Sequence, residues 1–497
     1  MKWMIKGATI MTLDDEDKWL ENGDIVVDQG KIVALGHDLS PEFFGVEQII
    51  EGRDKLVMPG LINAHLHSHD RFDKGRFDNL PLEVWGALYR PPLGGPEWTP
   101  RECYLRTVLN CIEMLKTGTT TVIDDVFHGV PLSKENINAV FQAYQDVGMR
   151  ALVSIYYHDR PYSKTIPYLE DLLPDNLKKE LAQIPTIAPD DMIEIWRDYA
   201  QRCRGRVGFV LSAAAPQRCY DEFLKKTWSL SSELDLPVIV HVLETKVQAI
   251  TGQLFYRKSI VEHMGSLGLL RPTTTLIHAV WVTDHDIALI GEAGASVIHN
   301  PGSNLKLGSG IAPIRKMLDA GINVGLGTDN NSANDTVNIF EAMKLAALLH
   351  KVADSDYHRW VGAKEALRMA TRGGARCGCL HKEVGNLSPG MKADMVLFDL
   401  NRLPFFPRNN LLHQLVFCEQ GGSVDTVIVD GKFVVERGRI TTVNEQKIVN
   451  EAMERDKEIQ DKIRRSTAKS GELEPYLRQA YFTCVRKDIG FSAYTGS

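Results

Sequence analysis

The sequence predicts an α/β protein: a (β/α)8 TIM barrel with a small flanking β-sandwich domain built from both chain ends. Two observations favour this fold class. Eight apolar, strand-length segments alternate with amphipathic, helix-length segments through the middle of the chain, and short strands rich in Val, Ile and Thr stand before and after them. The 497 residues are enough for a barrel and an accessory domain.

The chain opens with short β-type segments. Met4–Met11 and Gly23–Val27 are rich in Ile, Val and Thr, and Lys31–Leu35 follows a turn at residues 28–30. No helix-length pattern separates these segments. They therefore predict a hairpin-like meander and not a βα unit.

The middle of the chain carries the barrel pattern. The candidate strands are Gly60–His65, Thr119–Asp124, Ala151–Tyr156, Val207–Ala213, Pro237–Val242, Thr274–Ala279, Ala295–His299 and Ile322–Thr328. The candidate helices are Arg101–Lys116, Asn136–Val147, Asp190–Cys203, Tyr220–Leu234, Ser259–Leu267, Asp284–Glu292 and Ile311–Ala320, with two more at Asn338–Leu349 and Ala363–Thr371. Strands this continuous in apolar residues suit a parallel sheet that is covered on both faces.

β character returns after the barrel. Ala393–Asp399, Val424–Val429 and Lys432–Val435 are short strands, and Asp430-Gly431 between the last two is a type I′ hairpin signal. Because β segments flank the barrel on both sides, we expect them to pair into one small domain.

These patterns divide the chain into three parts. We expect a composite β-sandwich domain from residues 1–58 and 383–442, and a (β/α)8 barrel from residues 59–382. A C-terminal helical extension and tail fill residues 443–497, beginning with a charged helix over Asn444–Arg465. That helix is either a solvated surface element or part of a subunit contact. The motifs assign no role to the tail at 466–497.

Composition and charge exclude several classes of protein. The net charge of −7 disfavours a nucleic-acid partner, and 44% hydrophobic residues exclude a disordered polymer. No segment approaches the roughly 18 apolar residues of a membrane span, and the N-terminus lacks a secretory pattern. The eight cysteines form no CxxC pair and suit free thiols. These features favour a cytoplasmic protein without a membrane partner.

Five polar residues stand at the carboxyl ends of candidate barrel strands. His65 and His67 are two apart at the end of the first strand, so both imidazoles point to the same side. His241, His278 and Asp329 end the fifth, sixth and eighth strands. Catalytic groups of such barrels converge at this end. Imidazole nitrogens with a carboxylate suit Zn²⁺, and Fe²⁺ or Mn²⁺ less specifically.

Glu244 lies three residues beyond His241, in the segment HVLET. A carboxylate just past a ligand strand can reach a metal-activated water, which is the position of a general acid/base. The alternative role for Glu244 is that of a helix N-terminal acid stabilised by the helix dipole.

Five segments resemble the amidohydrolase superfamily in order and spacing: PGLINAHLH, HVLET, LIHAVW, HNPGSNLKLGSGIAPI and GLGTDNNSANDT. They are most similar to its aminohydrolase branch, which includes S-adenosylhomocysteine, guanine and cytosine deaminases and s-triazine hydrolases such as atrazine chlorohydrolase and melamine deaminase. The segments GDIVVDQGKIVALG and GNLSPGMKADMVLFDL also resemble this branch. The resemblance covers about residues 1–440.

The resemblance implies a role for each polar residue. His65, His67, His241 and Asp329 correspond to ligands of one divalent metal ion, Zn²⁺ before Fe²⁺, and His278 to a residue that hydrogen-bonds the attacking water or the substrate. Glu244 corresponds to the proton shuttle, so the catalytic set is Glu244, His278 and Asp329. No lysine ends the fourth strand, where the sequence is LSAAAPQRC, which favours one metal ion over two.

The expected reaction is hydrolytic deamination of an amino-substituted nitrogen heterocycle of the purine, pterin, pyrimidine or triazine type. The alternatives are displacement of chloride or an alkylamine from such a ring, or hydrolysis of a cyclic amide. A remote alternative is a non-catalytic structural relative. The stretch after the fourth strand lacks the histidine of many S-adenosylhomocysteine-type deaminases and looks closer to triazine hydrolases, which disfavours a nucleoside.

Residues in the loops after the strands are expected to contact a small heterocyclic substrate, because aromatic rings stack on a flat heterocycle and amides bond its edge. The candidates are Trp85, His128, Gln217, Trp281, His299, Asn300 and Asn330. The resemblance also implies a homodimer or a higher homo-oligomer.

Overall fold

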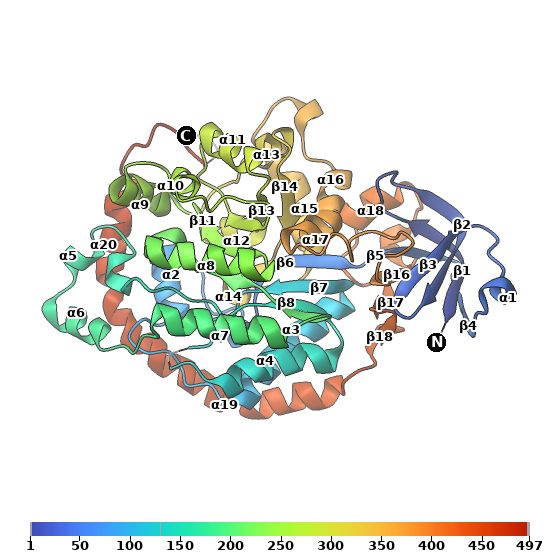
Figure 1. Cartoon of the computed structure of the whole chain (residues 1–497), viewed down its shortest axis with the longest axis horizontal. Coiled ribbons are helices and arrows are strands. Elements are labelled where there is room, and N and C mark those ends of the chain that lie inside the picture. The colour runs from blue at the N-terminus through green and yellow to red at the C-terminus, as the bar shows by residue number, and fades with distance from the viewer. Residues whose placement is uncertain (1, 130, 495–497) are drawn as a thin grey trace.

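The computed structural model describes residues 2–129 and 131–494. Figure 1 shows a β-sheet at one end of the molecule, where strands from the N-terminal part lie beside strands from the C-terminal part. A larger body of strands and helices fills the rest of the view.

Both chain ends contribute to one nine-stranded sheet. Its strands are β1 Trp3–Met11, β2 Trp19–Asp28, β3 Lys31–Gly36, β4 Gln48–Glu51, β5 Lys55–Pro59, β16 Met395–Asp399, β17 Val424–Val429, β18 Lys432–Glu436 and β19 Arg439–Ile440. The two halves of the sheet meet where β5 pairs antiparallel with β16. The prediction that segments from both ends pair with each other is therefore confirmed at the level of the strands.

The expected hairpin at Asp430-Gly431 is confirmed. β17 and β18 pair antiparallel, with Val429 opposite Lys432. Asp430 and Gly431 have φ angles of 52° and 74°, as both central residues of a type I′ turn require.

The larger body of the molecule contains two parallel five-stranded sheets. One runs in the order β15 Asp329–Asn330, β6 Leu61–His67, β7 Thr119–Asp124, β8 Arg150–Val153 and β9 Val207–Phe209. The other runs in the order β10 Leu211–Ser212, β11 Val238–Val242, β12 Thr274–His278, β13 Ser296–His299 and β14 Asn323–Leu326. Every pairing within both sheets is parallel.

The two parallel sheets are joined by chain segments that change partner. At the fourth expected strand, the Val210 amide donates to the carbonyl of Val153, and the Leu211 amide donates to the carbonyl of Pro237. At the eighth, the Gly327 amide bonds to the carbonyl of His299 and the Thr328 amide to that of His65. The fourth expected strand is therefore divided between the two sheets, and the chain at the end of the eighth bonds to both of them.

Helices alternate with the parallel strands along the chain. Their bounds are α1 Pro41–Phe44, α2 Leu82–Tyr89, α3 Pro100–Lys116, α4 Lys134–Val147, α5 Leu169–Leu172, α6 Asp175–Ala182, α7 Pro189–Arg202, α8 Asp221–Leu234, α9 Lys246–Tyr256, α10 Ile260–Ser266, α11 Asp284–Glu292, α12 Pro301–Lys306, α13 Ile314–Asp319, α14 Asn331–Asn334, α15 Ile339–Leu349, α16 Ala363–Arg368, α17 Gly374–Cys377, α18 Leu411–Phe417, α19 Glu445–Ser470 and α20 Glu474–Val485. Short 3-10 turns at Ser68–Asp73 (η1) and Pro216–Arg218 (η3) follow β6 and β10.

The C-terminal helices extend along the larger body of the molecule. α19 contacts α3 and α2, and α20 contacts α2, α9 and α5 (Figure 1). The expected charged helix over 444–465 is thus present and five residues longer at its end, while α20 adds a helix that the sequence pattern did not predict. Within the described residues, no helix combines the length and apolar character that crossing a membrane requires.

Candidate metal and active site

The polar residues at the strand ends form one buried cluster. His65 and His67 extend from β6, His241 lies on β11, His278 ends β12, and Asp329 begins β15. The Asp329 Oδ1 atom lies 3.3 Å from His65 Nε2 and 3.4 Å from His67 Nε2. The Nε2 atoms of His67 and His241 are 3.3 Å apart. The structure thus brings together residues that are separated by up to 264 positions in the sequence.

Two members of the cluster have a strained backbone. His278 and Asp329 have φ angles of 74° and 61°, in the left-handed region that costs a non-glycine residue about 1–3 kcal/mol. Gly327 permits the chain to pass close to the site, because a Cβ there would lie 2.3 Å from Asn300 Oδ1 and 2.8 Å from the Cβ of His65. Such local strain is typical of positions whose geometry serves a function.

The outer nitrogen of three cluster imidazoles is occupied by hydrogen bonds. The Nδ1 atom of His67 lies 2.5 Å from the carbonyl of Asp125, and that of His241 lies 2.8 Å from the carbonyl of Ala214. The His278 Nδ1 atom lies 2.9 Å from Asn304 Oδ1. These contacts leave each Nε2 facing the cluster, which is how protein contacts orient metal-binding histidines.

Burial and mutual contact set the charges of the cluster. Burial lowers the pKa of His67 to about 3 and that of His241 well below its usual value, so both imidazoles are neutral at pH 7. Burial alone would raise the pKa of Asp329, but its contacts with His65 and His278 hold that pKa well below the usual range. The set of donors is therefore neutral imidazole with carboxylate, the form in which these groups bind a divalent metal.

The residues present fit a metal ion. Ligand atoms of His65, His67 and Asp329 lie within 4.8 Å of one another, and so do those of His65, His241 and His278. Both ring nitrogens of His65 and the Oδ1 atom of Asp329 are buried without a hydrogen-bond partner. Buried polar atoms are seldom left unpaired, so a cation between them accounts for these donors.

Glu244 lies beside this cluster in the loop between β11 and α9. Its Oε2 atom is 3.6 Å from His278 Nε2, and its Oε1 atom is buried without a hydrogen-bond partner. Its amide donates to Gln248 Oε1 at 2.9 Å, which fixes the backbone at this position. Burial raises the pKa of Glu244 to about 7, where a carboxyl group can both accept and donate a proton near neutral pH.

A cavity opens over the cluster. It is lined by His67, Leu82, Trp85, Gly86, Tyr89, Arg90, Tyr156, Ala215, Arg218, His241, Glu244, Gln248, His278, Asp329 and Asn330. Trp85 and Asn330 are the two expected substrate contacts among them. The Trp85 ring stacks on Tyr89 with a centroid separation of 4.0 Å, so it presents a rigid aromatic wall.

Other expected substrate contacts lie behind the cavity wall. His128 and His299 are buried, and neither ring nitrogen of either residue has a hydrogen-bond partner. The His299 ring packs against His350, with centroids 5.4 Å apart. Gln217 is buried in η3 and does not line the cavity. Asn300 lies next to the site, where its Nδ2 atom is 3.4 Å from His278 Nδ1, so it contacts a catalytic candidate and not the cavity.

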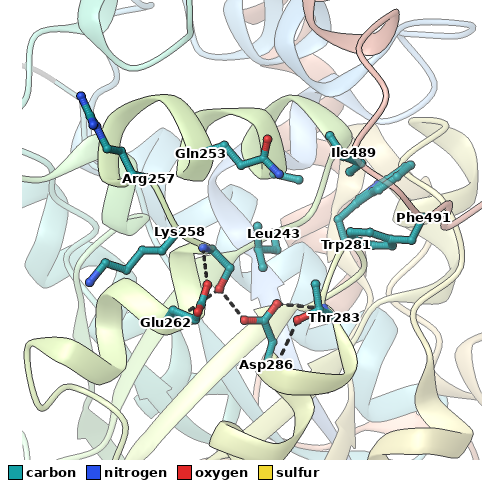
Figure 2. Close-up of a pocket in the computed structure, with 12 residues that line it drawn as sticks. Leu243, Gln253, Arg257, Lys258, Glu262, Trp281, Thr283, Asp286, Ile489 and Phe491 are labelled. Atoms are coloured by element: carbon teal, nitrogen blue, oxygen red, sulfur yellow. Dashed lines mark hydrogen bonds between the residues drawn. The ribbon is translucent and has the colours of Figure 1, made fainter.

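Trp281 lines a different cavity (Figure 2). Its indole N–H donates to the carbonyl of Ser309 at 2.7 Å, and the rings of Phe491 and Tyr494 lie 5.9 and 5.2 Å from it. Trp281 lies in the loop after the sixth strand, as the sequence predicts, but Phe491 and Tyr494 of the C-terminal tail pack beside its ring. Trp281 is therefore absent from the lining of the cavity over the cluster.

Four further side chains line the cavity beside Trp85 and Asn330. Tyr89 and Arg90 come from α2 and the residue after it, Tyr156 follows β8, and Arg218 ends η3. Arg218 directly follows the expected Gln217, and its proximity to a strand end is a signal for it. Tyr89 and Arg90 lie more than twenty residues beyond β6, so no strand-end rule identifies them.

Comparisons with known proteins match most of the chain. The amidohydrolase family matches residues 56–434. A 5-methylthioadenosine/S-adenosylhomocysteine deaminase from Caldanaerobacter subterraneus is 35% identical over 455 residues, covering 92% of this chain and 98% of that protein. A 5′-deoxyadenosine deaminase from Methanosarcina mazei is 32% identical over 456 residues, with the same coverage.

Solved structures show the same similarity. Atrazine chlorohydrolase from Arthrobacter aurescens TC1, complexed with zinc, superposes with a TM-score of 0.81 at 27% identity, covering 91% of this chain and 100% of that one. An adenosine deaminase from Xanthomonas campestris with bound zinc gives 0.78 at 26% identity, covering 93% and 98%. With the family match spanning most of its length, the chain belongs to the amidohydrolase family.

Proposed function

We propose that this protein is a metal-dependent aminohydrolase that removes ammonia from an amino-substituted nitrogen heterocycle. The observation that carries the proposal is the position of Glu244, whose buried carboxyl group lies 3.6 Å from His278 and beside the cluster of metal-binding candidates. A carboxyl group with a pKa near 7 next to such a cluster suits proton transfer during hydrolysis.

One divalent metal ion, Zn²⁺ before Fe²⁺, is the cofactor that we propose. His65, His67, His241 and Asp329 would hold it, which leaves His278 and Glu244 for the reacting groups. A metal bound there supplies Lewis-acid chemistry, lowering the pKa of water from about 15.7 to about 7. The zinc in two structurally similar proteins supports this choice.

The chain's own residues then handle the water, the substrate and the proton. Asp329 and His278 accept and donate hydrogen bonds that orient the attacking water toward a ring carbon. Glu244 takes a proton from that water and delivers it to the adjacent ring nitrogen. It next takes the second proton of the former water, now the hydroxyl on the ring carbon, and passes it to the leaving amino group, so the carbon–nitrogen bond breaks, a carbonyl forms and ammonia departs. Trp85 stacks on the heterocycle, and Asn330 contacts its edge.

A purine nucleoside is the first substrate class to test. Relatives at 31–35% identity are named for deamination of methylthioadenosine, S-adenosylhomocysteine or deoxyadenosine. The second candidate is displacement of chloride or an alkylamine from a triazine. It is favoured by the similarity to atrazine chlorohydrolase and by the absence of a histidine in the segment AAAPQRC after the fourth strand.

The experiment that tests the proposal is Glu244→Gln in the zinc-loaded enzyme. We expect ammonium release to fall by at least about 10²-fold, since proton transfer by a positioned side chain contributes that much, while bound zinc is unchanged. Glu292→Gln, a matched change at an exposed position, should retain both activity and zinc. Turnover by Glu244→Gln at the wild-type rate would remove Glu244 from the mechanism.

We also propose that the two parallel sheets close into one (β/α)8 barrel. The chain crosses from β9 to β10 through Val210 alone and from β14 to β15 through two residues, and both crossings carry backbone hydrogen bonds to the neighbouring strands. A composite β-sandwich of residues 1–58 and 383–442, and a homo-oligomeric assembly, complete the architecture that the family suggests.

A further inference from the structure

Two arginine side chains enter the catalytic cavity from different elements. Arg90 directly follows α2, and Arg218 ends η3, so the two guanidinium groups approach from separate walls. Both line the same cavity as Glu244, His278 and Asp329. The proposed mechanism uses neither of them.

Both arginines converge on Tyr156. The Arg218 Nη1 atom donates to Tyr156 Oη at 2.8 Å. The Arg90 guanidinium carbon lies 4.5 Å from the centre of the Tyr156 ring and 5.1 Å from that of Phe127. Aromatic faces hold a cation in place without neutralising its charge. The two positive charges are therefore oriented but remain available to a ligand.

No carboxylate pairs with either guanidinium group. Across residues 2–129 and 131–494, neither Arg90 nor Arg218 has a carboxylate oxygen within 4.0 Å. Arg150 shows the contrasting arrangement, because Asp394 accepts hydrogen bonds from its Nε and Nη2 atoms at 2.7 and 3.0 Å. Confining a positive charge without a partner is costly, so two such charges in one cavity indicate a site for an anion.

Two neighbouring titratable groups carry no charge at neutral pH. Burial lowers the pKa of His158 to about 3 and raises that of Tyr162 to about 12. Burial also opposes the negative charge of Glu83, whose pKa it raises. None of these three groups therefore replaces the carboxylate partner that the two arginines lack.

We propose that Arg90, Arg218 and Tyr156 form an anion subsite, which binds a carboxylate or phosphate group carried by the substrate beside the ring that is deaminated. Forked guanidinium donors match both kinds of oxyanion. The Tyr156 ring centre lies 6.2 Å from that of His241, so the anion lies close to the reacting ring and on a short substituent. This inference rests on the proposed function.

The test compares three compounds that share one reacting ring: adenosine, adenosine 5′-carboxylate and adenosine 5′-monophosphate. With the zinc-loaded enzyme, we expect kcat/KM for at least one anionic compound to exceed that for adenosine by about tenfold or more, as a charge-assisted hydrogen bond allows. The preferred anion distinguishes a carboxylate from a phosphate substituent.

Variants connect this preference to the two arginines. Arg218→Gln and Arg90→Gln should each lower the ratio of anionic to neutral kcat/KM by about tenfold, whereas Arg218→Lys, which keeps the charge, should retain most of the preference. Arg204→Gln removes the same charge at an exposed position and should leave the ratio unchanged. Zinc content and the unfolding temperature identify a glutamine variant that has failed to fold. In that case Arg218→Lys is used instead: a retained anionic preference supports the subsite, and a lost preference contradicts it.

Two results would overturn the inference while leaving the proposed function intact: equal kcat/KM for all three compounds, or an anionic preference that survives both glutamine substitutions. If none of the compounds releases ammonium, the proposed function fails separately. The subsite is then judged by the dissociation constants of adenosine 5′-carboxylate and adenosine. Tighter binding of the carboxylate that is lost in Arg218→Gln supports the subsite, and equal binding overturns it.

Discussion

The carboxylate of Asp70 connects the loop after β6 to the segment that carries Asp329. It accepts hydrogen bonds from the Asn330 side chain at 3.1 Å, from the Asn331 amide at 3.0 Å, and from the amide and hydroxyl of Ser332 at 3.0 and 2.7 Å. Burial raises the pKa of Asp70 against these bonds. Asp70 therefore holds the backbone just beyond Asp329, although it lies outside the cluster of metal-binding candidates.

This role predicts the effect of Asp70→Asn. An amide nitrogen facing several backbone and side-chain donors leaves some of them unpaired, which costs about 1–3 kcal/mol of stability. Because Asp70 supports the backbone next to the proposed ligand Asp329, its loss should also weaken metal binding by about 10–100-fold. Zinc titration and thermal unfolding measure both effects, with Asp78→Asn at an exposed position as the matched control. Wild-type zinc affinity in Asp70→Asn would contradict this role.

At the scale of single residues, the sequence predicts the cluster better than the cavity wall. His65 and His67 stand two apart at a strand end, and the geometry of a strand dictates that their side chains share a face. Asp329 likewise follows an apolar strand. Arg90 and Tyr89 reach the cavity only because α2 packs over it, a tertiary arrangement that has no periodicity in the sequence.

Among the elements, α20 holds two helices that border the site. Leu477 of α20, and Leu473 just before it, share one buried apolar cluster with Val84 and Ala87 of α2. On α9, the Lys246 side chain donates to the carbonyl of Val485 at 2.9 Å. Because α2 carries Trp85 and α9 begins just after Glu244, the C-terminal extension positions walls of the cavity.

We therefore expect Leu477→Ala to affect catalysis as well as stability. Removing a buried leucine side chain costs about 2–5 kcal/mol. Measured well below its unfolding temperature, the variant should show a raised KM and a smaller change in kcat, because the α2 wall is displaced while the metal cluster remains. Met453→Ala on the exposed face of α19 is the control. A lower unfolding temperature with an unchanged KM would show that α20 is only structural.

The sequence pattern predicted long, strongly amphipathic elements and missed short ones near the site. α3, α8 and the charged helix α19, with 17, 14 and 26 residues, were expected within five residues of their bounds. α2 is eight residues long, apolar and interrupted by Gly86, and α9 contains Gly252 and several β-branched residues. Such segments have weak helical preference and are stabilised by packing, which the sequence pattern does not show.

For the whole molecule, the composite sheet and the larger body that carries the candidate site are connected by buried charge. Arg150 begins β8, and Asp394 directly precedes β16; their two hydrogen bonds link a catalytic strand to the sheet formed by both chain ends. The Asp430 amide also donates to Asp394, at 2.7 Å, so the hairpin turn joins the same contact. The pairing of distant chain ends was predictable because both carried β segments, whereas this ion pair was not.

The whole structure supports one central claim: that the cluster of metal-binding candidates, Glu244 and an aromatic cavity act together in hydrolytic deamination. The most direct measurement is the product released by the zinc-loaded enzyme from 5′-methylthioadenosine and other aminopurine nucleosides, compared with chlorinated s-triazines. We predict one ammonium per substrate consumed, no chloride, and loss of activity after chelation that added zinc restores. Chloride release without ammonium, or ammonium release that continues in the metal-free protein, would contradict the account.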